Sequence, residues 1–485
     1  MPVASRSAGR RGRPRCLILL CWLAVGCILK VHAQDDGVLR ASVWITTPDE
    51  TRLLAPQAPV EFLPDDQTEP RAITIDVDDS QRFQTIHGFG GAMTDSAAWL
   101  IGTRMNTEQR DELMRALFDP QTGLGLSTVR HPAGASDFAL YHYSYDDLPA
   151  GETDEELVRF SIDHDREYII PLLQQALALN SQLNIIGTPW AVPGWMKTSD
   201  SLIGGSLRLE SYEAYANYLV RYVQAFAAEG VPLAAITPIN EPLFVPPAYP
   251  GMYMDAENQT EFIKTYLGPA FAAAGLTTQI LIFDQNWDRT DFPIHVLNDQ
   301  VARAFVAGTA FHCYHGSVAE QSVLHELHPD KIILVSECSG LVGSNFGEDI
   351  RWTMRNLFIG ATRNWATDVL LWNLALDQSS GPTSGGCPNC RGVVTIDQTT
   401  GAVSFNVEYY LLGHASFAAR PGAIRVASPS NSGGIETVAF LNPDGAKGLL
   451  VLNDGGHEET FKVRWAGLSF SYALPPGAVA TFRWP

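Results

Sequence analysis

Two glutamates at the ends of apolar runs are the residues with the clearest capacity for chemistry. Glu241 lies in residues 236–242, "ITPINEP", where two prolines flank an Asn-Glu pair directly after the apolar run "VPLAAI". Glu337 ends a second run, in "ILVSECSG". Two carboxylates at one opening are what glycosidic bond cleavage requires: one protonates the leaving oxygen, and the other, ionised, attacks the anomeric carbon. Their surroundings must hold the two pKa values apart.

Two further residues in these patterns support a catalytic interpretation. Arg130 ends an apolar run in "TVRHP" and would hold the Glu337 carboxylate in its ionised form. Asn240, directly before Glu241, could form a hydrogen bond with a sugar hydroxyl. A single glutamate after a strand is usually a solvated loop residue, so the pairing of two such residues is what favours chemistry.

Eight short strand-like runs end on polar or aromatic residues and alternate with stretches of helical spacing. In the stretch 210–230, for example, Tyr215, Leu219, Tyr222 and Phe226 fall on one face and Gly230 ends the helix. This alternation predicts an α/β fold, a parallel (β/α)8 TIM barrel, with a doubly wound open sheet as the alternative. The eight runs are residues 84–91, 126–132, 183–190, 233–242, 279–288, 309–315, 331–337 and 369–377.

The barrel interpretation explains how the two glutamates would meet. The loops at the C-terminal ends of the strands converge over one mouth in this fold. Glu241 would follow the fourth strand and Glu337 the seventh, nearly opposite each other around that mouth. The flanking prolines would stiffen the loop that aims Glu241.

The sequence pattern changes near residue 420. Runs such as "ETVAFL" and "GLLVLN" alternate apolar and polar residues, and "NPDG" and "NDGG" separate them, which predicts antiparallel strands. The runs "VLRASVWITT" and "RAITIDV" nearer the N-terminus could supply further strands. We therefore expect residues 34–82 and 420–485 to form an accessory antiparallel β-sandwich beside a catalytic barrel at 83–419.

The N-terminal segment has the pattern of a removable secretory signal peptide at residues 1–33. Five arginines precede the uncharged run "CLILLCWLAVGCIL", and "VHA" ends at Ala33. The apolar run is too short for a comfortable membrane span. We expect a secreted, extracellular protein, with lipoprotein anchoring at Cys27 as a minor alternative.

The charge of the chain excludes some classes of partner. The formal net charge of −20 becomes −26 without residues 1–33, because that segment holds six basic and no acidic residues. A surface this acidic repels phosphate backbones and anionic lipid headgroups, so we expect no nucleic-acid binding and no stable membrane association. A neutral sugar is compatible with it.

Four cysteines remain after the predicted cleavage. Cys387 and Cys390, in "GGCPNCRG", are predicted to form a small disulfide, since zinc would need a second ligand pair. Cys313 and Cys338 follow apolar runs and are predicted to be buried thiols.

Three other patterns have simpler interpretations. The glycines of "HGFGGAMTD" lack the spacing of a nucleotide loop and would permit a tight turn. His312 and His315 would point to opposite faces of a strand, so we expect no metal site. Several aromatic residues near strand ends each suit packing, and together they suit a sugar-binding wall: Trp190, Trp195, Tyr249, Trp287, Tyr314 and Trp372.

Six motifs in this order resemble glycoside hydrolase family 30, the family of lysosomal glucosylceramidase and microbial β-1,6-glucanases. They are "HGFGGAMTDSAA", "VRHPAGASDF", "PWAVPGWMKT", "PINEP", "LVSECSG" and "WNLALD". The resemblance covers residues 83–420 roughly, motif by motif, and the flanking β segments fit the sandwich of that family.

The resemblance implies a retaining mechanism, with Glu241 as general acid/base and Glu337 as the nucleophile of a covalent glycosyl-enzyme. It implies no metal and no organic cofactor. Other residues are assigned by the same motifs: hydroxyl contacts to Asp137 and Trp190, the 2-hydroxyl to Asn240, the floor to Trp372, and positioning or tuning of the nucleophile to Arg130, His312 and Tyr314.

The resemblance specifies the aglycone less closely than the glycone, which it implies to be β-glucose. The loop after Glu241, "LFVPPAYPGMYMD", departs from the mammalian enzyme beyond Tyr249, while "FDQNWD" and "GGCPNCRG" look closer to the microbial glucanases. The expected substrate is thus a carbohydrate or glycolipid, β-1,6-glucan or glucosylceramide. Alternatives are a β-xyloside or β-fucoside, an inverting mechanism, or a non-catalytic β-glucan-binding protein. Asn258 begins a glycosylation sequon that only a eukaryotic host would use.

Overall fold

A computed structural model describes residues 37–66 and 73–485. The chain divides into the units Met1–Gly37 and Val38–Pro485, and every helix and strand below belongs to the second unit. The predicted signal peptide at residues 1–33, with Cys27, lies outside the described residues.

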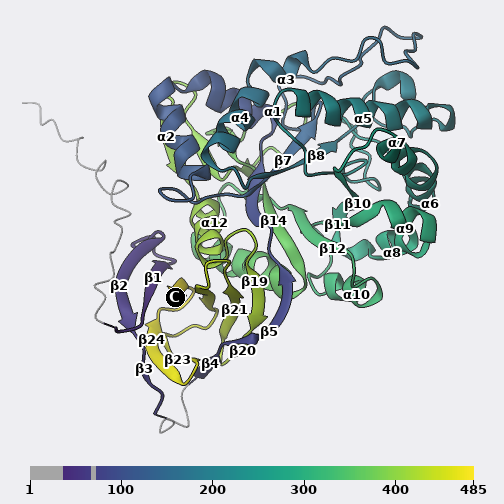
Figure 1. Cartoon of the computed structure of the whole chain (residues 1–485). Helices are drawn as coiled ribbons and strands as arrows, with labels where there is room; N and C mark the ends of the chain where they lie inside the picture. Colours follow the sequence, from purple (N-terminus) through teal and green to yellow (C-terminus); the bar gives the residue numbers. More distant parts are fainter. Residues whose placement is uncertain (1–36, 67–72) are drawn as a thin grey trace, which may run out of the picture. The chain divides into compact units, whose positions relative to one another are not determined.

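Eight parallel strands close into a barrel, which confirms the predicted fold class (Figure 1). The strands are nearly continuous buried runs, as expected where helices cover one face and a packed interior the other. In sequence order they are β6 (Gly88–Ala92), β7 (Thr128–Ala133), β8 (Asn184–Pro189), β9 (Ala235–Ile236), β10 (Gln279–Asn286), β11 (Val306–His312), β12 (Ile332–Glu337) and β14 (Ala366–Asn373).

Two predicted strands differ in extent from those observed. The run 233–242 forms only the two-residue strand β9, because its prolines lack the N–H that a ladder needs. The run 84–91 divides: β5 (Asp78–Thr85) belongs to the sandwich, and the barrel strand β6 begins at Gly88.

Helices surround the barrel, and local sequence fixes their ends. Helix α2 (Thr107–Phe118) begins with a capping box in which Asn106 and Gln109 satisfy each other's backbone donors. The predicted face of α5 (Tyr212–Ala228) is fully buried. The other α-helices before the sandwich are α1 (Asp95–Trp99), α3 (Asp163–Glu167), α4 (Ile169–Leu179), α6 (Ala256–Glu261), α7 (Gly268–Ala273), α8 (Asp291–Asn298), α9 (Gln300–Phe305), α10 (Glu320–Leu327), α11 (Phe346–Thr353) and α12 (Val407–Ala418).

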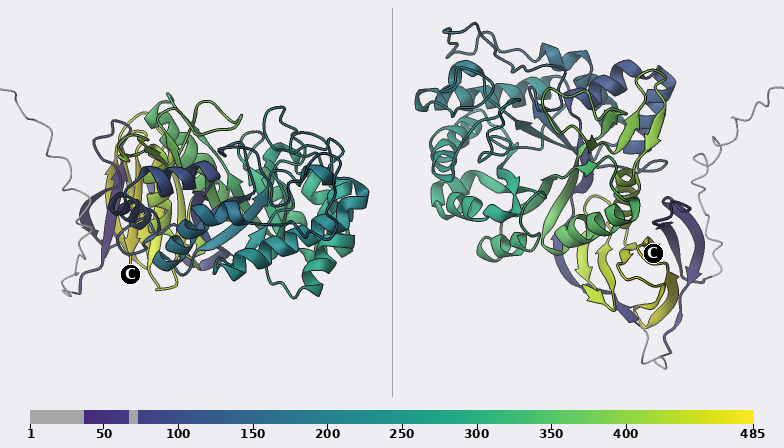
Figure 2. Two further views of the ribbon diagram at one scale, coloured as in Figure 1. Left: turned by 90° about the horizontal axis from the view of Figure 1, so that it is seen from above. Right: turned by 180° about the vertical axis from the view of Figure 1, so that it is seen from behind.

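The predicted sandwich is also present, and both ends of the described chain contribute to it. Its larger sheet has the order β2-β1-β25-β22-β21-β19-β5, with β20 beside β21, and its smaller sheet the order β3-β24-β23-β4. Figure 2 shows the purple N-terminal strands beside the yellow C-terminal ones. The bounds are β1 (Arg40–Thr46), β2 (Ala55–Glu61), β3 (Leu63–Pro64), β4 (Ile73–Asp76), β19 (Ile424–Ala427), β20 (Asn431–Ser432), β21 (Ile435–Leu441), β22 (Lys447–Asn453), β23 (Glu459–Trp465), β24 (Leu468–Leu474) and β25 (Val479–Trp484).

Helix α12 packs against both the barrel and the sandwich, so the two share a buried boundary. His414 on this helix contacts Thr46 at 2.9 Å and Thr481 at 2.8 Å, and burial lowers its pKa to about 3. A neutral imidazole between two hydroxyls therefore joins α12 to strands from both ends of the chain. Among the described residues, no helix combines the length and the apolar character needed to cross a bilayer.

Candidate active site

The two predicted glutamates lie together at the barrel mouth. Glu337 is the last residue of β12, and Glu241 follows β9 after a short turn. One oxygen of each carboxylate and one ring nitrogen of His312 all lie within 4.8 Å of one another. The barrel thus brings together residues that are far apart in the sequence.

Glu337 is buried between two hydrogen-bond donors. Arg130 Nη1 donates to Oε2 at 2.5 Å, and the Tyr314 hydroxyl donates to Oε1 at 2.9 Å. The two oxygens therefore both act as acceptors, as an ionised carboxylate does. Burial of the Tyr314 hydroxyl, together with the charge of Glu337, raises the pKa of Tyr314 well above its usual value, so it remains a donor.

Arg130 is completely buried and joins three side chains. Besides Glu337, its Nη2 donates to Asn240 Oδ1 at 2.6 Å and to Asp284 Oδ2 at 2.8 Å. Its guanidinium carbon also lies 4.7 Å from the ring centre of Trp190. Burial opposes the charged form, but the carboxylates of Asp284 and Glu337 raise the pKa of Arg130 above its ordinary value. The cation is a fixed element of the site.

Asp284 is the central residue that sequence analysis missed. Although burial favours the neutral acid, Arg130 and His312 lower the pKa of its carboxyl group far below the usual range. Its other partners are the hydroxyls of Ser336, at 2.6 Å, and Thr237, at 2.8 Å. A charged residue inside the otherwise apolar run "ILIFDQ" was the available signal.

His312 links both catalytic candidates to Asp284. Its Nδ1 lies 3.0 Å from Glu241 Oε1 and 3.9 Å from Glu337 Oε1, and its Nε2 lies 3.2 Å from Asp284 Oδ1. Burial works against its charge, but these carboxylates raise the pKa of His312 to about 10. The resemblance associates His312 with the nucleophile, whereas its hydrogen bond goes to Glu241.

The same geometry bears on metal binding. A protonated imidazole has no lone pair for a cation, and both His312 nitrogens face carboxylates. His315 is exposed and does not belong to the cluster formed by His312, Glu241 and Glu337. The donor set therefore suits an ion-pair network better than a metal centre.

The backbone around Glu241 is strained, and its neighbours hold it. Glu241 has φ 42°, a left-handed conformation that non-glycine residues adopt at a cost of roughly 1–3 kcal/mol. Its N–H donates to the carbonyl of Asp284 at 3.0 Å, and the Asn240 N–H donates to Pro189 O at 2.8 Å. Asp284 itself has φ 62°, at a bulge in β10. The polar turn after β9 thus stores strain that aims Glu241 at Glu337.

Aromatic rings and a buried acid form the other wall of the site. Trp190 and Trp372 stack at 5.1 Å, and Tyr249 and Cys387 pack against their cluster. Burial, with the charges of Glu337 and Glu241, raises the pKa of Asp137 well above its usual value. Burial and the same carboxylates also raise the pKa of Tyr249. These side chains present neutral hydrogen-bonding groups beside flat apolar rings.

Two disulfides brace the loops of the mouth. The predicted thiols Cys313 and Cys338 are instead bonded, with Cα atoms 5.4 Å apart. That prediction was wrong because β11 and β12 are neighbours whose ends place the two residues within bonding range. The second disulfide joins Cys387 to Cys390. In its loop, a Cβ on Gly386 would lie 2.6 Å from Asp137 Oδ2, so glycine permits this close approach.

A cavity of about 370 Å³ opens beside Glu241. Most of the side chains around it are polar, and Phe244 and Tyr314 leave much of their ring surface exposed. The lining residues are Glu241, Leu243, Phe244, Gln285, Asn286, Asp288, Arg289, Tyr314 and His315. Glu241 therefore faces His312 and Glu337 and also borders an open polar cavity.

The sequence matches the "Glycosyl hydrolase family 30 TIM-barrel domain" over residues 86–416 and the "Glycosyl hydrolase family 30 beta sandwich domain" over residues 422–482. The chain belongs to glycosyl hydrolase family 30. The resemblance inferred from the six motifs is confirmed, and this family 30 protein is a β-glycoside hydrolase.

Its relatives in this family include endo-1,6-β-glucanases and glucosylceramidases. It is 33% identical to Endo-1,6-beta-D-glucanase neg1 of Aspergillus fumigatus over 85% of this chain and 88% of that protein. It is 31% identical to Lysosomal acid glucosylceramidase of Mus musculus over 83% of this chain and 82% of that protein. A solved endo-beta1,6-glucanase has a TM-score of 0.85 and 32% identity, covering 92% of this chain and 99% of that structure.

Proposed function

We propose that this family 30 hydrolase is an exported, retaining enzyme that cleaves β-1,6-glucan, with Glu337 as nucleophile and Glu241 as acid/base. The observation that carries the proposal is the pair of carboxylates whose nearest oxygens lie within 4.8 Å and whose partners differ. Retaining glycosidases place their carboxyl groups about 5–5.5 Å apart, and inverting enzymes need about 6.5–9.5 Å for a water molecule. The close spacing favours direct attack by Glu337.

The charges around the pair suit two successive steps. In the first step Glu241 acts as the general acid for the leaving oxygen, while Glu337 attacks the anomeric carbon from the other side of the bond. Attack by Glu337 forms an ester to the anomeric carbon as the bond to the leaving oxygen breaks and that oxygen takes the Glu241 proton. The resulting Glu241 carboxylate, beside charged His312, then takes a proton from the attacking water, which hydrolyses the ester and releases the Glu337 carboxylate.

Hydrogen bonds within the protein also fix the groups that would hold the sugar. The Asn240 oxygen accepts from Arg130, so its amide NH2 is left to donate to a substrate oxygen, in our proposal the 2-hydroxyl. Asp137 and Trp190 would contact other hydroxyls of the same ring, and Trp372 forms the floor. These contacts strengthen as charge develops at the anomeric carbon.

The cavity beside Glu241 supports a sugar rather than a ceramide as aglycone. Gln285, Asn286 and Asp288 offer amide and carboxylate groups that pair with hydroxyls, and burying them under acyl chains would leave them without partners. Several relatives are endo-1,6-β-glucanases, which agrees with this choice. Export is supported by the basic–apolar segment at residues 1–33 and by two disulfides, which persist in oxidising compartments.

Azide rescue tests the assignment of the two glutamates. Glu337→Gly should lose at least about 10³-fold in kcat on an aryl β-glucoside, and azide should restore turnover with an α-glycosyl azide as product. Glu241→Gly with azide should give the β-azide, because the nucleophile is intact. Glu458→Gly, in an exposed turn of the sandwich, is the control for handling and folding. Absence of α-azide from the Glu337 variant would refute the nucleophile assignment.

Product analysis tests the substrate. Wild-type protein is incubated with β-1,6-glucan, gentiobiose, glucosylceramide, and aryl β-xyloside and β-fucoside. Release of gluco-oligosaccharides from the glucan at the highest kcat/KM supports the proposal. Preference for glucosylceramide, preference for another glycone, or glucan binding without release of reducing sugar would each contradict it.

A further inference from the structure

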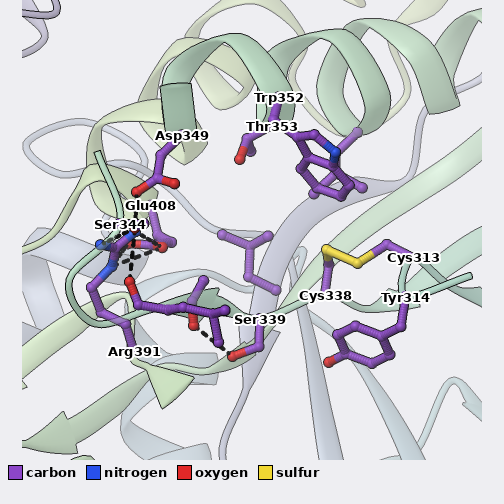
Figure 3. A pocket seen from close by; sticks show the side chains of 14 residues that line it. Cys313, Tyr314, Cys338, Ser339, Ser344, Asp349, Trp352, Thr353, Arg391 and Glu408 are labelled. Carbon is purple, nitrogen blue, oxygen red and sulfur yellow. Dashed lines mark hydrogen bonds and ion pairs between the residues drawn. A yellow bond between two sulfur atoms is a disulfide. The ribbon is translucent and has the colours of Figure 1, made fainter. Parts of the chain in front are cut away.

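A second cavity, of about 300 Å³, lies next to the active site and has no assigned role (Figure 3). Tyr314, whose hydroxyl binds Glu337, lines both this cavity and the one beside Glu241. The Cys313–Cys338 disulfide forms the wall between the two strand ends. The two cavities therefore meet at Tyr314, whose hydroxyl contacts Glu337.

One face of helix α11 forms the upper wall in Figure 3. Asp349, Trp352 and Thr353 are spaced three and four residues apart and share this face. The neighbouring Ile350 and Met354 are fully buried and pack in the core, whereas Trp352 is 45% exposed. A tryptophan that the core does not use, turned toward a cavity, is available to bind a ligand.

A second wall, which meets α11 at Asp349, is polar. Arg391 donates to Glu408 and Asp349, at 2.7 Å in each case, and to Ser344 at 3.1 Å. Two carboxylates around one guanidinium leave this wall with no excess positive charge to attract an anion. Strand β13 (Gly340–Leu341), directly after the nucleophile loop, pairs with β16 (Cys390–Arg391) and holds Arg391 in place.

Two polar groups at the cavity are the Thr353 hydroxyl and Asp349 Oδ1. In the described part of the chain, neither the Thr353 hydroxyl nor Asp349 Oδ1 has a hydrogen-bond partner. Trp352, Leu341 and the disulfide add apolar surface beside them. A flat apolar face rimmed by hydroxyl-binding groups matches a neutral pyranose ring.

We propose that this cavity binds a glucosyl residue of the glucan chain beyond the bond that is cleaved, with the ring stacked on Trp352 and its hydroxyls bound by Asp349 and Thr353. The inference rests on the proposed β-glucanase function and adds a determinant of chain length to it. The substrate chain passes over Tyr314, between the reacting bond and Trp352. A substrate that fills only the space between Glu241 and Glu337 does not reach this ring.

Kinetics with long and short substrates test the site. For Trp352→Ala, the ratio of kcat/KM on β-1,6-glucan to that on an aryl β-glucoside should fall about tenfold, with Trp352→Phe intermediate. The matched control is Leu327→Ala, another exposed apolar residue, at the end of α10; it should leave both values unchanged. An unaltered ratio in Trp352→Ala would overturn the inference.

Binding without turnover provides the second measurement. In a Glu337→Gln background, calorimetry compares gentiobiose with a β-1,6-linked glucotetraose. We expect the tetraose to bind more tightly than gentiobiose, and Trp352→Ala to weaken tetraose binding about tenfold. Equal tetraose affinity with and without Trp352 would refute the site. If the wild-type protein cleaves glucan and Trp352→Ala changes neither measurement, this inference alone is refuted. If the wild-type protein cleaves neither glucan nor the aryl β-glucoside, the proposed function is refuted and this site with it.

Discussion

The two sides of the proposed cleavage site, one for the glycone and one for the acceptor, are built differently. On the glycone side, Arg130, Asp284 and Trp190 are buried, and hydrogen bonds or ring contacts fix each of them. On the acceptor side, Phe244 is 46% exposed and Tyr314 is 40% exposed. One side is thus a preorganised charge network, and the other is an open surface that can accommodate more than one partner.

The difference separates chemistry from selection of the aglycone. A buried ion network keeps its geometry when charge develops in the transition state, because it needs no rearrangement at that moment. An exposed surface contributes through contact area and can change without disturbing the network. Substitutions on the first side should therefore alter kcat and stability together, and substitutions on the second should alter mainly the response to chain length.

Loss of Arg130 should have the largest effect. Arg130→Met would leave the carboxylates of Asp284 and Glu337 buried without their cation, which costs about 3–5 kcal/mol of unfolding free energy. We expect kcat on an aryl β-glucoside to fall at least about 10³-fold. Urea unfolding and single-turnover assays measure both quantities, with the exposed Arg159→Met as control. Stability within about 1 kcal/mol of wild type would contradict the network interpretation.

Removal of the Asp284 charge should have a smaller effect. Asp284→Asn keeps the shape of the side chain but weakens its hold on Arg130 and His312, so we expect a loss of about 2 kcal/mol. Activity should fall about 10–100-fold, mainly in kcat, because the substrate still finds its contacts. Asp330→Asn, at an exposed position before β12, is the matched control. A change confined to KM would show that Asp284 serves binding and not the charge network.

Stability should depend on pH through His312. Its pKa is about 10 in the folded chain and near its ordinary value of 6.5 when unfolded. The folded state therefore holds an extra proton between these values; the stabilisation is complete below about 6.5 and disappears as pH rises through about 10. The slope is at most about 1.4 kcal/mol per pH unit.

The measurement is the difference between wild type and His312→Gln in urea unfolding from pH 6.5 to 10. Buried Lys197, whose pKa burial lowers to about 7, acts in the opposite direction over this range, and the difference removes its contribution. Equal slopes in the two proteins would show that His312 is not charged in the native state.

The sequence was informative about elements with local signals. Polar residues at the ends of apolar runs predicted the strands of the barrel and the position of Glu241 and Glu337. This worked because the C-terminal end of a strand can be recognised from its own local sequence. Asp284 was not predictable in this way. Its partners Arg130, Thr237, His312 and Ser336 come from or directly follow four different strands, and only barrel closure brings them together.

The same limit applies to contacts set by register. Cys313 and Cys338 each look like a buried thiol until β11 and β12 are known to be adjacent. The ion network around Arg391 depends on an insert after β14 that folds back to pair with the segment directly after Glu337. Neither pairing leaves a periodic pattern in the sequence.

The smallest effect is expected on the acceptor side. Phe244→Ala removes an exposed ring from the cavity beside Glu241, so unfolding free energy should change by less than about 0.5 kcal/mol. We expect KM for β-1,6-glucan to rise about threefold and kcat on an aryl β-glucoside to remain within experimental error, because the buried network is untouched. Leu243→Ala, at the same cavity but half-buried, should affect stability more than binding. If Phe244→Ala lowered kcat on the aryl glucoside as strongly as Asp284→Asn does, the two sides of the site would be mechanically coupled and the division between a fixed glycone side and an adaptable acceptor side would be wrong.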